Sequence, residues 1–255
     1  MKLITWNVNS IRVRMERLAA LLERHRPDVV CLQELKVTDD IFPAAAVEAM
    51  GYRCAVYGQK AYNGVAILSR GEPADVSRGL CDAVPDPDSR LIAATIDGVR
   101  IISAYFPNGS FVGSEKYQYK LQWMHRLRTH LEQCYQPDQP LVLCGDLNVA
   151  VDDQDVANPE LWASSVLCHP TARAALQEIA DWGLVDVFAK MHPEGGIYSW
   201  WDYQLLSFPK NNGLRIDHVL ATRPLADKTT AAEVDRNERK GKSPSDHAPV
   251  IVTFE

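Results

Sequence analysis

The chain has 255 residues, of which 46% are hydrophobic and 24% are charged. This is ordinary usage for a soluble globular protein, and it excludes a disordered chain, a collagen and a coiled coil. No run of 18 apolar residues occurs, so we expect no membrane span. The formal net charge of −6, from 27 basic and 33 acidic residues, argues weakly against a nucleic-acid-binding protein, because such proteins tend to be basic.

Short apolar runs rich in β-branched residues recur along the chain and predict strands. They cover residues 3–8, 28–33, 65–69, 91–96, 99–106, 141–144, 216–221 and 249–254. Apolar residues at helical spacing predict helices over about 11–26, 114–135 and 171–182. Several of the strands are apolar on both faces, so they should be covered on both sides. We therefore predict one α/β domain over residues 1–255, with two mixed sheets packed face to face and helices outside.

The N-terminus and the cysteines indicate the compartment. The chain starts directly with strand-like sequence and lacks the long apolar stretch and cleavage site of a signal peptide. The six cysteines form no Cys-x-x-Cys pair and no Cys/His cluster with zinc-finger spacing. A reduced, cytoplasmic protein is the expectation.

Polar side chains interrupt or follow the predicted strands at five separate places. They are Asn7 and Asn9, Glu34, Asp146 and Asn148, Asp217, and the pair Asp246 and His247. One such residue would be ordinary turn chemistry. Because buried carboxylates are costly unless they are paired, hydrogen-bonded or metal-bound, five cases favour strand ends that converge on one site. Oxygen ligands with few imidazoles favour Mg²⁺ or Mn²⁺ over zinc, and such a metal suits phosphoester hydrolysis.

Seven short motifs carry a resemblance to a known family. They are Thr-Trp-Asn-Val-Asn-Ser at 5–10, Leu-Gln-Glu-Leu-Lys at 32–36, Asn-Gly-Val-Ala at 63–66, Tyr-Phe-Pro-Asn-Gly at 105–109, Gly-Asp-Leu-Asn at 145–148, Leu-Arg-Ile-Asp at 214–217 and Ser-Asp-His-Ala-Pro at 245–249. In this order they resemble the exonuclease III family of DNA-repair nucleases, which includes the class II apurinic/apyrimidinic endonucleases. The resemblance implies a four-layered α/β sandwich and a Mg²⁺-dependent hydrolysis of DNA that leaves a 3′-hydroxyl.

The resemblance also implies roles for individual residues. The implied metal-site residues are Glu34 as main ligand, with Asn7, Asp146, Asn148 and Asp246 beside it. The implied catalytic residues are His247, Asp217 as the acid that hydrogen-bonds it, Asp146 as the residue that orients or deprotonates the attacking water, and Tyr105 and Asn148 near the scissile phosphate. The expected DNA contacts are Asn9, Lys36, Asn108, Lys116, Trp200, Leu214 and Arg215. The sequence does not decide which group is the general base.

Several alternatives stay open at this stage. Trp200 and Trp201 are either core aromatics or a wedge against an extruded nucleotide. The segment 150–173 and Leu214 depart from the pattern of abasic-site endonucleases, which leaves the preferred lesion open. The substrate is expected to be double-stranded DNA with abasic sites, nicks, or blocked or recessed 3′ ends. A phosphatase acting on a non-DNA phosphoester and a non-enzymatic binding protein are the competing functions.

Charge is unevenly placed along the chain, which changes how the net charge is interpreted. Residues 103–130 carry a net +3 and residues 205–223 a net +2, whereas residues 146–160 hold five acids and no base. We therefore expect local basic loops to contact DNA on an otherwise acidic body, giving a salt-sensitive affinity. A monomer is the default expectation.

Overall fold

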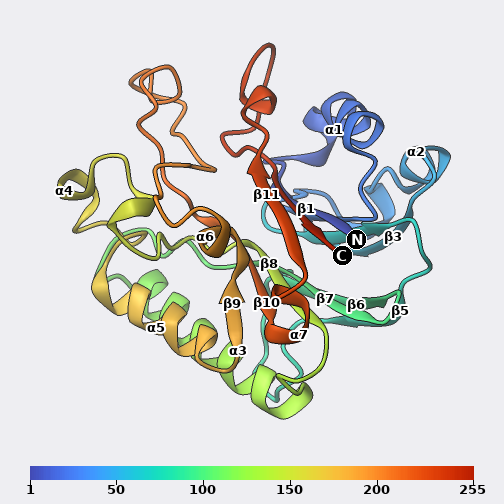
Figure 1. The fold of residues 1–255 in the computed structure, drawn as a ribbon, viewed down its shortest axis with the longest axis horizontal. Helices are drawn as coiled ribbons and strands as arrows, with labels where there is room; N and C mark the ends of the chain where they lie inside the picture. Colours follow the sequence, from blue (N-terminus) through green and yellow to red (C-terminus); the bar gives the residue numbers. More distant parts are fainter.

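The computed structural model describes all of residues 1–255 and contains two six-stranded sheets packed face to face (Figure 1). The first sheet has the order β11-β12-β1-β2-β4-β3, and its strands are β1 (Lys2–Asn7), β2 (Val29–Gln33), β3 (Arg53–Tyr57), β4 (Val65–Ser69), β11 (Thr229–Val234) and β12 (Val250–Phe254). The second has the order β5-β6-β7-β8-β10-β9, and its strands are β5 (Ala74–Arg78), β6 (Leu91–Ile96), β7 (Val99–Tyr105), β8 (Leu141–Asp146), β9 (Leu184–Asp186) and β10 (Asp217–Thr222). Each sheet has one parallel pair, β1–β2 or β7–β8, among antiparallel ones, so both are mixed as predicted.

Helices cover the outer faces of the two sheets and complete four layers (Figure 1). Helices α1 (Ile11–His25) and α2 (Ala44–Ala49) contribute to the core outside the first sheet. Helices α3 (Glu115–Cys134) and α5 (Pro170–Ala180) do the same outside the second sheet. The shorter helices are α4 (Pro159–Trp162), α6 (Val187–Met191) and α7 (Arg223–Ala226), with 3₁₀ turns η1 (Asp39–Ile41), η2 (Asp153–Asp155) and η3 (Arg236–Arg239). The predicted α/β sandwich is confirmed.

The core between the sheets explains why the strands read as continuous apolar runs. Cys31 and Ile67 of the first sheet belong to one buried cluster with Ile101, Val142 and Cys144 of the second. The inner strands of both sheets also have an outward face, and that face packs on helices. Strands covered on both faces lose the alternation of a half-exposed strand. All six cysteines are free thiols.

The sequence patterns missed four strands, and all four lie at sheet edges. They are β3, β5, β9 and β11, the outermost strands of the two sheets. Strand β5 is almost wholly exposed, and β11 has one buried residue in six. An edge strand of this kind is partly solvated and often polar, so it lacks the apolar run on which the prediction depended.

The strand pairings bring the ends of several strands to one end of the sandwich. In the first sheet the parallel register sets Asn7 beside Gln33, the residue before Glu34. In the second sheet Asp146 is the register partner of both Tyr105 and Asp217. The chain termini lie side by side elsewhere, and the Met1 amino group donates to the Phe254 carbonyl at 2.6 Å (Figure 1). No helix has the length and apolar character needed to span a bilayer.

Candidate active site

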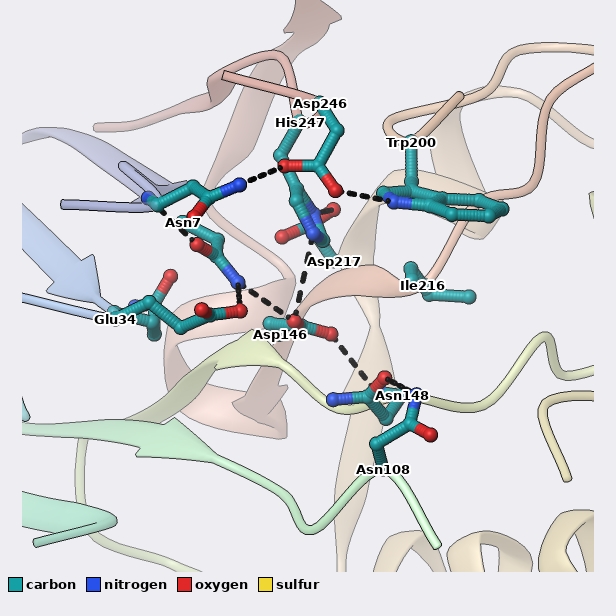
Figure 2. Close-up of polar contacts among 12 residues, drawn as sticks. Asn7, Glu34, Asn108, Asp146, Asn148, Trp200, Ile216, Asp217, Asp246 and His247 are labelled. Carbon is teal, nitrogen blue, oxygen red and sulfur yellow. Dashed lines mark hydrogen bonds and ion pairs between the residues drawn. The ribbon is translucent and has the colours of Figure 1, made fainter. Parts of the chain in front are cut away.

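The amide of Asn7 connects carboxylates from both sheets (Figure 2). Asn7 Nδ2 donates to Glu34 Oε1 at 2.8 Å and to Asp146 Oδ2 at 2.9 Å. The backbone N–H of Asn9 donates to Asn7 Oδ1 at 2.9 Å, which fixes the orientation of the amide. The predicted convergence of strand ends is therefore present in the structure.

His247 is buried in an ion pair at the centre of the site. Its Nδ1 lies 2.8 Å from Asp217 Oδ2, and its Nε2 lies 3.6 Å from Asp146 Oδ2. Burial lowers the pKa of His247, but the carboxylates of Asp217 and Asp146 outweigh this and raise the pKa to about 10. The imidazole is therefore charged at neutral pH. Ser199 Oγ donates to the same Asp217 oxygen at 2.6 Å and holds this carboxylate from behind.

Asp146 faces His247 in surroundings that favour proton uptake. Burial raises the pKa of Asp146 to about 7, although charged His247 acts in the opposite direction. The preceding Gly145 has φ 145°, and a Cβ there would lie 1.8 Å from the Ala104 carbonyl oxygen. Only glycine allows β8 to approach β7 this closely, and this approach places Asp146 at the site.

Non-glycine residues in left-handed backbone conformations gather at the site. Glu34 has φ 53°, Lys36 58°, Asn148 50° and Asn9 44°. Such conformations cost on the order of 1 kcal/mol or more each and cluster at functional sites, where the surrounding structure enforces them. The turns that follow β1, β2 and β8 are thus built to aim side chains into one place.

The amides of Asn108 and Asn148 lie on the side of Asp146 away from His247 (Figure 2), and the phenol of Tyr105 lies near Glu34 and Asp146. Asn108 Nδ2 donates to Asn148 Oδ1 at 3.0 Å, and Asn148 Nδ2 donates to the Phe106 carbonyl at 3.0 Å (Figure 2). Burial and the nearby acids raise the pKa of Tyr105 well above its ordinary value, so the phenol keeps its proton. A groove of about 560 Å³ adjoins these groups, and the exposed Lys116 is among its lining residues.

The donor set suits a hard divalent cation. Potential ligand atoms of Glu34, Asp146 and His247 lie within 4.8 Å of one another. Because His247 is charged, the carboxylate oxygens are the available ligands, and oxygen ligation is what Mg²⁺ and Mn²⁺ prefer. The second Glu34 oxygen accepts from Lys36 Nζ at 2.9 Å. The residues present therefore fit a metal site of the predicted kind.

Two predicted DNA contacts are wrong, because both side chains are buried. Arg215 is 4% exposed, and its guanidinium is paired with Asp155 at 2.6 Å and with Asp186 at 2.7 Å. Its charge is thus neutralised inside the protein. Leu214 is 0% exposed and belongs to the core beneath the second sheet. Neither side chain is free to contact a phosphate or a base.

The expected basic loop over residues 103–130 is also largely neutralised. Lys120 is fully buried and donates to the carbonyls of Asn108, Asn148 and Val166 at 2.7–3.2 Å. Burial lowers the pKa of Lys120 to about 7. Arg126 is paired with Asp82 at 2.8 Å. Local positive charge for DNA is consequently smaller than the sequence count indicated.

The two adjacent tryptophans have different positions. Trp201 is 0% exposed and packs against Phe208, with ring centroids 5.1 Å apart. Trp200 is half-buried at the site, and its indole N–H donates to Asp246 Oδ2 at 3.0 Å (Figure 2). Ser199 was not predicted as a site residue, because a serine before two aromatics carries no pattern that identifies it as a partner of a distant aspartate.

Comparisons with known proteins identify the family and the fold of the chain. The chain matches the model of the Endonuclease/Exonuclease/phosphatase family over residues 4–247. It is 35% identical to exodeoxyribonuclease III of Haemophilus influenzae, with 100% of both chains covered. An AP endonuclease from Archaeoglobus fulgidus has a TM-score of 0.98 at 41% identity, covering 100% of this chain and 99% of that one. A 3′ phosphatase (NExo) from Neisseria, bound to a product DNA hairpin, has a TM-score of 0.96 at 43% identity, with the same coverage.

These matches show the family of the chain and its relationship to exodeoxyribonuclease III. The chain belongs to the Endonuclease/Exonuclease/phosphatase family, whose members are metal-dependent. Within that family it is a full-length relative of exodeoxyribonuclease III, as the seven motifs predicted.

Proposed function

We propose that the protein is a Mg²⁺-dependent DNA-repair phosphodiesterase that hydrolyses phosphodiester bonds in double-stranded DNA and leaves 3′-hydroxyl ends. Mn²⁺ is expected to replace Mg²⁺. The observation that carries the proposal is the charged His247, backed by Asp217 and 3.6 Å from Asp146, with Glu34 completing the cluster. This constellation offers a cation for a phosphate oxygen, an acceptor for a proton and ligands for a metal.

The residues of this chain divide the work of hydrolysis between them. His247 donates its Nε2 proton as a hydrogen bond to a phosphate oxygen and stabilises the negative charge that grows there. Asp217 keeps the imidazole charged and oriented. Asp146 orients the attacking water and accepts its proton, and the 3′ oxygen that leaves as the P–O bond breaks is protonated from solvent. A divalent metal bound by Glu34 and Asp146 would supply Lewis-acid stabilisation of the same phosphate.

Side chains beside Asp146 complete the hold on the phosphate. Tyr105 remains a protonated donor, and the amides of Asn108 and Asn148 form a fixed pair next to it. Groups that are already oriented cost no reorganisation at the moment of reaction. We propose that these three residues bind phosphate oxygens on the side opposite His247.

We propose DNA as the partner because the relatives named above include an exodeoxyribonuclease, an AP endonuclease and a 3′ phosphatase bound to DNA. Among DNA substrates we favour recessed or blocked 3′ ends over internal abasic sites. The loop at 164–171 is fastened against α3: Tyr117 Oη lies 3.0 Å from His169 Nδ1, and Lys120 donates to the Val166 carbonyl at 2.8 Å. Because these hydrogen bonds keep the loop from moving away from Asn148, we propose that little space is left there for an extruded abasic sugar.

We also propose that the protein acts as a monomer in the cytoplasm. The site is built from one chain, which supports action as a monomer. Free cysteines fit the reducing cytoplasm, where a bacterial protein of this kind meets the nucleoid DNA.

The substrate experiment compares end-labelled duplexes in parallel. One carries an internal abasic analogue, one a recessed 3′ end and one a 3′-phosphate at a nick; inositol phosphates serve as the non-DNA phosphoester. We expect Mg²⁺-dependent release from the 3′ ends to exceed cleavage at the abasic analogue. Release of phosphate from inositol phosphates without DNA cleavage would contradict the proposal and support the phosphatase alternative.

A further inference from the structure

A short extended segment, residues 199–201, lies between the two halves of the active site. The backbone of Leu214 exchanges hydrogen bonds of 2.9–3.0 Å with one edge of this segment. Residues 246–248 bond to its other edge, at 2.7 and 3.0 Å. The segment thus joins the chain that leads into β10 to the turn that precedes β12.

Two consecutive side chains of the segment each reach a different carboxylate. Ser199 Oγ donates to Asp217 Oδ2 at 2.6 Å, and Trp200 Nε1 donates to Asp246 Oδ2 at 3.0 Å (Figure 2). Successive residues of an extended chain point to opposite sides. One segment can therefore hold two acids that lie on different sides of it.

Asp246 is held from its other side as well. Asn9 Nδ2 donates to Asp246 Oδ1 at 2.9 Å, and Lys36 Nζ donates to Asn9 Oδ1. The ammonium group fixes the orientation of the Asn9 amide, with its oxygen toward Lys36 and its nitrogen toward the carboxylate. Each Asp246 oxygen thus accepts from a neutral donor, Asn9 or Trp200, and Oδ1 also accepts from Ser245 Oγ at 3.5 Å. The carboxylate is oriented, and its negative charge acts on the neighbouring His247.

We propose that Trp200 is a positioning residue that acts through its indole N–H: it orients the Asp246 carboxylate beside His247, so that its charge favours a cation bound by Glu34 and Asp146, independently of any contact between the ring and DNA. The inference rests on the proposed metal-dependent function. The two parts of the Trp200 side chain have different partners. The indole N–H donates to Asp246, and the ring packs edge-on against Trp162 at a centroid distance of 5.7 Å. Partners that orient the groups of a metal site commonly change metal affinity by about 10- to 100-fold when removed.

The test compares Trp200→Phe with wild type and with Trp201→Phe. The first variant keeps an aromatic ring and removes the N–H that reaches Asp246. The control removes the N–H of Trp201, which donates to Asn211 at 3.3 Å rather than to a carboxylate of the site. Binding of Mn²⁺ to the metal-free protein is followed by electron paramagnetic resonance, without DNA and without turnover. Thermal unfolding verifies that each variant is folded.

We expect Trp200→Phe to bind Mn²⁺ about tenfold more weakly than wild type, with Trp201→Phe within twofold of it. Binding of a recessed-end duplex in EDTA, measured by fluorescence anisotropy, should be within twofold for all three proteins. Unchanged Mn²⁺ affinity in Trp200→Phe, or an equal loss in Trp201→Phe, would overturn the inference. Failure of the proposed function is distinguishable, because it would appear as no DNA cleavage by wild type with saturating Mn²⁺.

Discussion

Replacing Asp217 with Asn tests the claim that the site depends on a charged imidazole. Burial lowers the pKa of His247, and Asp217 at 2.8 Å is the strongest of the charges that raise it to about 10. An Asn side chain keeps an oxygen that accepts from Nδ1 but removes the negative charge. The pKa of His247 in the variant should therefore fall toward its ordinary value of 6.5, because burial still lowers it while Asp146 and Asp246 still raise it.

The size of the effect follows from the two pKa values. With a pKa of about 10, about 99% of His247 is charged at pH 8, whereas with the ordinary value only about 3% is charged. Turnover by Asp217→Asn should therefore fall below wild type by up to about 30-fold at pH 8 and by at most about twofold at pH 6.5. In wild type the raised pKa of His247 keeps the active, protonated imidazole populated to higher pH. The activity of the variant relative to wild type should therefore fall as pH rises.

The assay measures kcat for release from a labelled, recessed 3′ end between pH 5.5 and 9 at saturating Mg²⁺. Asp138→Asn makes the same chemical change at an exposed position and should match wild type throughout. A loss in Asp217→Asn that is the same at every pH would refute the reasoning, because it would show that Asp217 does not act through the charge of His247.

Three further predictions concern the neighbours of these groups. Glu34→Gln should raise the Mg²⁺ concentration for half-maximal rate at least tenfold, seen in a metal titration; an unchanged requirement would remove Glu34 from the metal site. Ser199→Ala should lower kcat about tenfold with KM unchanged, and Ser199→Thr should restore it, because the hydroxyl donates to Asp217 at 2.6 Å. Arg215→Met should lower the free energy of unfolding by about 3–5 kcal/mol in urea, because two buried carboxylates lose their partner. A loss of DNA affinity with full stability would instead restore Arg215 as a DNA contact.

The layers of the fold were predictable because the core strands of this protein are covered on both faces. Residues 65–69 and 91–96 form β4 and β6 with the predicted bounds. The exposed strand β5 was not predictable in this way, because its residues, Ala-Asp-Val-Ser-Arg, satisfy backbone pairing on one side and solvent on the other. An apolar sequence pattern indicates a buried strand, and an edge strand such as β5 has few buried residues.

The candidate site was predictable where polar residues break apolar runs, and unpredictable where burial decides the role. Asp146 and Asp217 stand at strand ends and face each other in register. Arg215, two residues earlier in the chain, has the same polar character in sequence but is buried against partners 29 and 60 residues away. Lys120 likewise occupies a helix position that a sequence count treats as a free charge, although it is fully buried. Pairing at such separations leaves no local signal.

Cleavage of a labelled duplex with a recessed 3′ end, with Mg²⁺ and with EDTA, tests whether the protein is a metal-dependent DNA phosphodiesterase. We predict that wild type shortens the labelled strand only when metal is present and leaves a 3′-hydroxyl. His247→Ala should bind the duplex but not cleave it. Cleavage that persists in EDTA, or near-normal cleavage by His247→Ala, would contradict the account.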